Sequence, residues 1–109
     1  MKSNPFLEYI LYDVFNERDN VTARFMMGGH ILYKDGKVFA LVEDEKLYLK
    51  VSKDNEKWFL ENGSNKFTYE KKDKDGNRKS QTLNFFLVPE EIIEDRERLQ
   101  EWLDEARIF

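Results

Sequence analysis

The chain has 109 residues, about the length of one domain, and it contains no cysteine and a single histidine. Disulfides, a thiol nucleophile and zinc sites built on Cys or on several His are therefore excluded. The net charge of −4 argues against broad non-specific DNA binding, and an aromatic content of 15% argues against disorder. Neither a signal peptide nor a membrane-length apolar run is present, so we expect one soluble, cytoplasmic domain over residues 1–109 that does not contact a membrane.

The first half of the chain predicts one helix followed by three strands. Asn4 before Pro5 is typical of a helix start, and apolar residues at three- and four-residue spacing follow, so we expect a helix near residues 5–16. Asp35-Gly36 between apolar runs is a strong hairpin signal. The strands expected here cover 23–34 (interrupted at Gly28-Gly29), 37–43 and 46–51, with a second tight turn at Asp44-Glu45.

The second half predicts a helix near 54–62, which Gly63 ends, then two strands and a final helix. The two strands run from Phe67 to Lys72 and from Gln81 to Val88, with a polar hairpin loop between them. The last helix is expected to begin at an Asp95 cap and to bury the stripe Leu99, Trp102, Leu103 and Ala106. These elements define an α+β fold in the order α-β-β-β-α-β-β-α: an antiparallel five-stranded sheet with helices packed on one face.

Two-residue turns fix which side chains share a sheet face. Across the first turn we expect Tyr33 opposite Val38 and Ile31 opposite Ala40, and across the second turn Ala40 opposite Leu49. This register gives one face without charges, expected to pack on the helices: Ile31, Tyr33, Val38, Ala40, Val42, Leu47, Leu49 and Val51. The opposite face combines apolar residues with His30, Lys34, Lys37, Lys46 and Lys50; its apolar members are Leu32, Phe39, Leu41 and Tyr48. These four residues are our candidate interaction surface, for a protein partner or a second copy of the chain. The alternative is that the C-terminal strands or a terminal segment cover them.

Catalytic chemistry has little support in the sequence. The string from Met26 to His30 has two glycines inside a strand, which favours a structural bulge over a phosphate-binding loop. His30 has no neighbour at a spacing that would orient it as a general base, so we expect a partly exposed strand histidine. The eight carboxylates between Glu90 and Glu105 are expected to form a solvated helix face. We therefore predict no catalytic residue, cofactor or metal ligand, and an enzyme is the least favoured interpretation.

A basic hairpin loop is the candidate nucleic-acid contact. Residues 71–79 contain five basic and two acidic side chains, and the basic ones are Lys71, Lys72, Lys74, Arg78 and Lys79. With Phe67 and Tyr69 nearby, this loop could contact a nucleic-acid backbone. The alternative is an ordinary solvated turn.

An ordered series of short motifs resembles the N-terminal domain of the TfoX (Sxy) family. The motifs are Arg24-Phe25-Met26-Met27-Gly28-Gly29, Leu32-Tyr33-Lys34-Asp35-Gly36, Phe39-Ala40-Leu41-Val42, Leu47-Tyr48-Leu49-Lys50-Val51, Phe67-Thr68-Tyr69-Glu70, Val88-Pro89-Glu90-Glu91 and Leu99-x-x-Trp102. The resemblance covers nearly the whole chain and implies a secretion-chaperone-like α+β fold without enzymatic activity. The best-known members of the family are coactivators of competence-gene transcription. By resemblance, we expect a regulatory domain that contacts proteins, with the transcription machinery as a partner.

Overall fold

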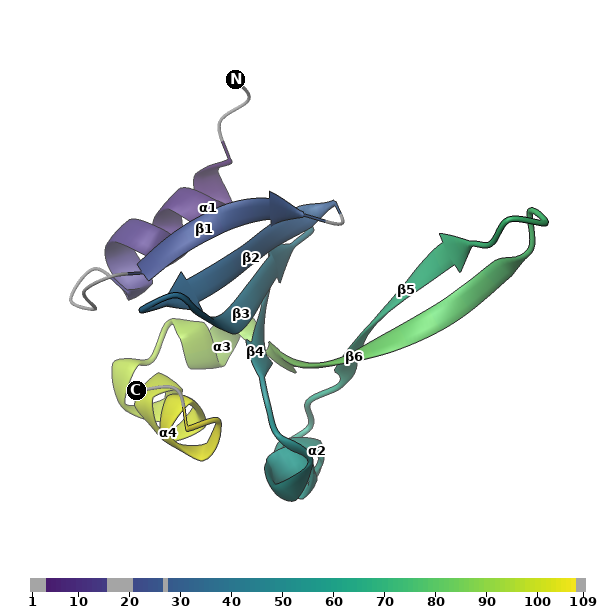
Figure 1. Cartoon of the computed structure of the whole chain (residues 1–109). Helices are drawn as coiled ribbons and strands as arrows, with labels where there is room; N and C mark the ends of the chain where they lie inside the picture. Colours follow the sequence, from purple (N-terminus) through teal and green to yellow (C-terminus); the bar gives the residue numbers. More distant parts are fainter. Residues whose placement is uncertain (1–3, 16–20, 27, 108–109) are drawn as a thin grey trace.

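The computed structural model describes residues 4–15, 21–26 and 28–107 (Figure 1). In these residues a single antiparallel sheet has the strand order β1-β2-β3-β4-β6-β5. The elements are α1 (Pro5–Glu8), η1 (Tyr9–Val14), β1 (Val21–Met26), β2 (Gly29–Lys34), β3 (Lys37–Glu43), β4 (Lys46–Lys50), η2 (Lys53–Asn55), α2 (Glu56–Glu61), β5 (Lys66–Lys72), β6 (Arg78–Val88), α3 (Glu90–Ile93) and α4 (Arg96–Glu105).

The α+β class and the antiparallel sheet are as predicted, but the sheet has six strands in the described residues, not five. The predicted first strand over 23–34 is in fact the hairpin β1–β2, in which Met26 pairs with Gly29. Gly28 lies in this turn with a φ of +80°, a conformation that glycine adopts without the steric penalty of a Cβ. The prediction that the two glycines break the strand is confirmed. The break is a full chain reversal, which adds a strand to the element order.

The helix ends follow the predicted signals. The Asn4 side chain accepts a hydrogen bond from the Leu7 N–H at 3.0 Å, and Pro5 opens α1. Asp95 caps α4 by accepting from two backbone N–H groups of its first turn. Gly63, at a φ of +82°, ends α2. The first helix differs from the prediction because it widens into the π-helical segment η1, and the end predicted for it at residue 16 lies outside the described residues.

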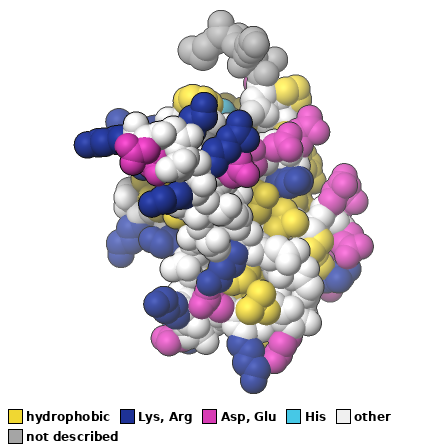
Figure 2. Space-filling model, turned by 90° about the vertical axis from the view of Figure 1, so that its right-hand side faces the viewer, with side chains coloured by type: hydrophobic (Ala, Val, Ile, Leu, Met, Phe, Trp, Pro, Cys, Tyr) yellow, Lys and Arg dark blue, Asp and Glu magenta, His cyan; other side chains and the backbone are white. Residues whose placement is uncertain are grey.

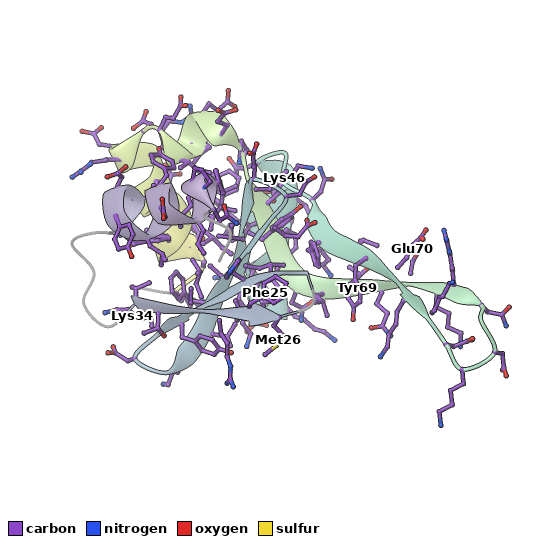
Figure 3. All side chains as sticks on the ribbon, turned by 90° about the horizontal axis from the view of Figure 1, so that it is seen from above. Phe25, Met26, Lys34, Lys46, Tyr69 and Glu70 are labelled. Atoms are coloured by element: carbon purple, nitrogen blue, oxygen red, sulfur yellow. The ribbon has the colours of Figure 1, made fainter. Side chains whose placement is uncertain are left out.

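The main core lies between one face of the sheet and the helices. Side chains from η1, α2, α3 and α4 all join the same buried cluster, so the prediction of helices on one face is confirmed. Figure 3, seen from above, shows α1, α3 and α4 gathered on one side of β1–β4. The sheet contributes Leu32, Phe39, Ala40, Val42, Leu47, Leu49, Val51, Phe86 and Val88 to this cluster.

A β-bulge changes the predicted faces of β2 and β3. Next to the turn, Tyr33 pairs with Val38 as predicted, but Leu32 pairs with Ala40, so that one extra residue stands in β3. One residue of offset moves side chains to the opposite face. Three residues predicted on the helix side therefore lie on the other face, namely Ile31, Tyr33 and Val38, while Leu32 and Phe39 lie on the helix side. The predicted pairing of Ile31 with Ala40 is wrong. The β3–β4 register, with Ala40 opposite Leu49, is as predicted.

A second apolar cluster covers the opposite face of the sheet. It consists of Ile31, Leu41, Tyr48, Phe67 and Phe85, with Tyr33, Val38, Tyr69, Leu83 and Leu87 packed against it. In Figure 1 the strands β5 and β6 turn steeply away from β1–β3, so this face is concave. The Phe67 ring therefore reaches Tyr48 edge-on, with ring centroids 5.1 Å apart.

Candidate functional site

The four residues of the candidate interaction surface do not form an exposed patch. Their exposed fractions are 0% for Leu32, 4% for Phe39, 1% for Leu41 and 8% for Tyr48. The bulge places the first two in the core under the helices, where the Phe39 ring meets Phe15 edge-on at 5.4 Å. The bend of the sheet buries the other two in the second cluster. The prediction that this set is an open surface is therefore wrong.

Tyr48 has a phenol pKa above its ordinary value of 10.0, first because of burial and second because of the nearby carboxylates Glu43 and Asp44. A raised phenol pKa means that the folded state favours the neutral form. This contribution to stability is fully present below pH 10 and is lost as the pH rises through the higher folded-state pKa. We expect the unfolding free energy of Tyr48→Phe to fall less between pH 9 and pH 12 than that of the unmutated protein. Denaturant titrations over this range check it, and parallel curves for the two proteins would contradict it.

Among the described residues, strand β1 leaves one edge of the sheet open. It stands at the end of the strand order, and five of its six residues are exposed. Near its end the Phe25 side chain is 68% exposed and lies edge-on to the His30 ring at 5.3 Å, and Met26 beside it is 40% exposed (Figure 3). His30 is thus a partly exposed strand histidine, as predicted. An edge strand of this kind presents unpaired backbone groups together with apolar side chains.

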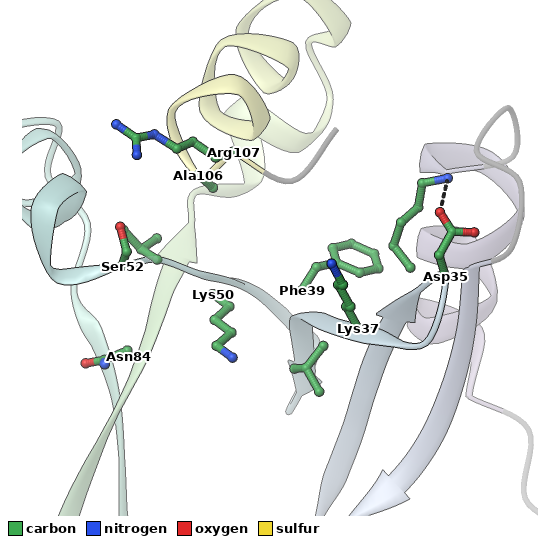
Figure 4. A pocket seen from close by; sticks show the side chains of 11 residues that line it. Asp35, Lys37, Phe39, Lys50, Ser52, Asn84, Ala106 and Arg107 are labelled. Carbon is green, nitrogen blue, oxygen red and sulfur yellow. Dashed lines mark ion pairs between the residues drawn. The ribbon is translucent and has the colours of Figure 1, made fainter.

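A hollow of about 510 Å³ lies between the β2–β3 turn, the end of β4 and the end of α4 (Figure 4). Its charged residues are Lys34, Asp35, Lys37, Lys50 and Arg107, and the first two form an ion pair at 3.7 Å. Its apolar wall includes Phe39, Val51 and Ala106. Sequence reasoning missed this hollow because its walls come from segments up to about seventy residues apart, and no local pattern joins them.

The five predicted basic residues of the β5–β6 hairpin lie together near its end. Lys71 pairs directly with Lys79, and Lys72 pairs directly with Arg78. Arg78 also contacts Glu70, with 3.5 Å between the guanidinium Nη1 and the carboxylate Oε2. The turn is held by Asp73, whose carboxylate accepts hydrogen bonds from the N–H groups of Asp75 and Asn77, each at 2.9 Å. The sequence therefore located this cluster correctly.

The carboxylates of the C-terminal segment form a solvated surface, as predicted. Seven of the eight are exposed, and Glu105 is half-buried. In the described part of the chain, no three His, Cys, Asp or Glu side chains come close enough together to hold a metal ion.

The geometry defines a small α+β domain with a helix-covered sheet, an open edge strand and a projecting basic hairpin. The chain belongs to the TfoX N-terminal domain family, whose model matches residues 13–107. A search of curated proteins found no match. Among the helices of the described residues, none is long and apolar enough to cross a membrane.

Proposed function

We propose that this chain is a non-enzymatic, cytoplasmic regulatory domain that acts through protein contacts, as a transcription coactivator of the competence type. Membership of the TfoX N-terminal domain family supports a regulatory role. The observation that supports binding of a partner protein is the open edge of β1, near whose end the side chains of Phe25 and Met26 are exposed. This edge replaces the buried candidate surface as the place of contact.

The occupant we propose is an extended segment of a partner protein that adds a strand next to β1. Strand addition uses the backbone N–H and C=O groups of the edge for affinity, and side chains along the strand for specificity. In β1 the charged residue is Arg24, and the large exposed side chains are Phe25 and Met26. Cross-strand pairing then favours a partner segment with an acidic residue opposite Arg24 and an apolar residue opposite Phe25.

The experiment begins with a photo-crosslinking amino acid in place of Phe25, introduced in the native host. The crosslinked protein is identified, purified and titrated with the unmutated chain and with Phe25→Lys. A lysine on an edge strand disfavours strand addition, and an exposed aromatic residue at a contact commonly carries binding energy. We expect Phe25→Lys to weaken binding by about tenfold or more, equivalent to about 1.4 kcal/mol. Charge reversal in Arg24→Glu is expected to weaken binding of an acidic segment as well.

The matched control is Leu60→Lys, because Leu60 is a similarly exposed apolar residue, at 56%, that lies on α2. It should leave the affinity unchanged. Equal losses in Leu60→Lys and Phe25→Lys would contradict a contact at β1. A crosslink that joins two copies of this chain would replace the proposed partner with a homodimer.

A further inference from the structure

The end of the β5–β6 hairpin, residues 70–79, forms a slender arm that projects from the body of the molecule. Figures 1 and 3 show the two strands continuing well past the rest of the sheet, with Glu70 already outside the packed body. Apart from half-buried Asp73, every residue of this arm is exposed. The arm therefore contributes little to a packed core, and the side chains of the arm are accessible to a ligand.

The charges of the arm oppose its own folding. Two successive cross-strand positions carry cations on both strands: Lys71 opposite Lys79, and Lys72 opposite Arg78. Like charges directly opposite each other destabilise a hairpin, and the contact of Glu70 with Arg78 offsets this repulsion at one position only. A hairpin that served only as a solvated turn would gain stability from opposite charges at these positions.

The net charge of the arm is positive, whereas the net charge of the whole chain is negative. Its five basic and three acidic side chains give +2, and because the full chain carries −4, the remaining residues carry −6. The acidic helices α3 and α4 lie at the opposite end of the molecule from the arm (Figure 1). Figure 2, viewed from the side to which the hairpin points, shows many Lys and Arg side chains on that face. An anionic ligand is therefore attracted to the arm and repelled from the helical end.

Cations lie on both faces of the ribbon. Strand alternation places Lys71 and Lys79 on one face and Lys72 and Arg78 on the other, while Lys74 lies in the turn. A flat anionic surface would contact only one of these faces. A groove with phosphates on both walls contacts both, and the major groove of B-DNA, about 12 Å wide, admits a two-stranded β-ribbon.

We propose that the arm enters the major groove of duplex DNA and that Lys71, Lys72, Arg78 and Lys79 bind phosphates on its two walls. A hollow of about 380 Å³ beside the turn offers room for a phosphate; it is lined by Lys71, Lys72, Asp73, Lys74, Lys79 and Gln81. Single-stranded nucleic acid fits less well, because its binding proteins stack bases on aromatic side chains. Residues 70–79 contain no aromatic residue, and the nearby Tyr69 ring is stacked on Phe67 with its hydroxyl bonded to Gln81 at 2.7 Å.

The test is a fluorescence anisotropy titration of the full chain with a labelled 20-base-pair duplex between about 50 and 200 mM salt. Four phosphate contacts predict a slope of log K against log salt of about −3.6. The double variant Lys71→Gln/Lys79→Gln should reduce the slope by about 1.8 and weaken binding by about tenfold or more. The matched control Lys53→Gln/Lys57→Gln removes the same charge from exposed positions near and on α2 and should bind like the unmutated chain.

A second variant separates binding from folding. Lys79→Glu places a carboxylate opposite Lys71, so it should raise the thermal midpoint by about 1–4 °C while it abolishes DNA binding. Phe25→Lys, which tests partner binding at the β1 edge, should leave DNA binding unchanged. Failure of the proposed partner contact is therefore distinguishable from failure of the proposed DNA contact.

Three results would overturn the inference. The first is an absence of salt-dependent binding to the duplex by the unmutated chain. The second is an equal loss of affinity in Lys71→Gln/Lys79→Gln and in its control Lys53→Gln/Lys57→Gln. The third is tighter binding to a single strand of the same sequence, which would rule out insertion into a groove.

Discussion

Trp102→Ala is expected to lower the free energy of unfolding by about 3–5 kcal/mol, the range for truncation of a large buried aromatic residue. The Trp102 side chain is 4% exposed and belongs to the main core. Its ring meets the rings of Trp58 and Phe59 edge-on, each at a centroid distance of 5.4 Å, so that it fixes α4 against α2. Truncation leaves a cavity and removes both aromatic contacts. Urea denaturation monitored by far-UV circular dichroism gives the loss.

The control for this prediction is Glu101→Ala, one residue earlier in α4. Glu101 is exposed, and its change to alanine should alter stability by no more than about 0.5 kcal/mol. A loss below about 1 kcal/mol in Trp102→Ala, or equal losses in the two variants, would show that the stripe on α4 does not anchor the helix.

Local signals predicted most of the element boundaries because the physics that sets them is local. The Asp95 cap lies within three residues of the N–H groups that it satisfies, and the apolar stripe beyond it follows from helix periodicity alone. The Asp35-Gly36 turn is similar: both residues have positive φ, as the tight hairpin turn requires. Asp44 and Glu45 adopt positive φ as well. Because neither residue is glycine, the dipeptide is a weak turn signal by itself, and the turn was predicted from the strands on either side of it.

The faces of β2 and of the start of β3 could not be predicted, because a bulge has no local signature here. No glycine or proline lies beside the register shift between Leu32 and Tyr33. Burial of Phe39 against Phe15 accompanies the shift, and that partner is more than twenty residues away. The bend that covers Tyr48 with Phe67 is equally non-local. The apolar residues of the sheet were identified correctly. Their assignment to faces failed at the bulge, for Ile31, Leu32, Tyr33, Val38 and Phe39, and is correct for the rest of β3 and for β4.

The two candidate sites, the basic arm and the β1 edge, also differ in how far local sequence predicts them. The basic residues of the arm are close in sequence, and a hairpin necessarily brings them together. Their pairing as like charges depends on the register, which the loop composition alone does not determine. The open edge at β1 follows from the strand order, a tertiary property with no sequence signal of its own.

Gly29→Ala is expected to lower the free energy of unfolding by about 2–3 kcal/mol, the cost of overpacking a close contact. Gly29 is buried, and a Cβ at this position would lie 2.7 Å from the carbonyl oxygen of Val42 and 3.1 Å from the Cβ of Glu43. The nearest of these atoms is backbone, so β2 and β3 have to move apart to accept a methyl group. Thermal and urea unfolding both report the loss.

Gly28 gives a contrasting control because its constraint is conformational, not steric. A Cβ at Gly28 would meet no atom within 4 Å, but its φ of +80° disfavours alanine, so Gly28→Ala should lose about 1 kcal/mol. Asparagine tolerates a positive φ, so Gly28→Asn should recover part of this loss, whereas Gly29→Asn should be at least as destabilised as Gly29→Ala. Rescue by asparagine at position 29, or unchanged midpoints for both alanine variants, would show that close approach of β2 to β3 is not what requires glycine there.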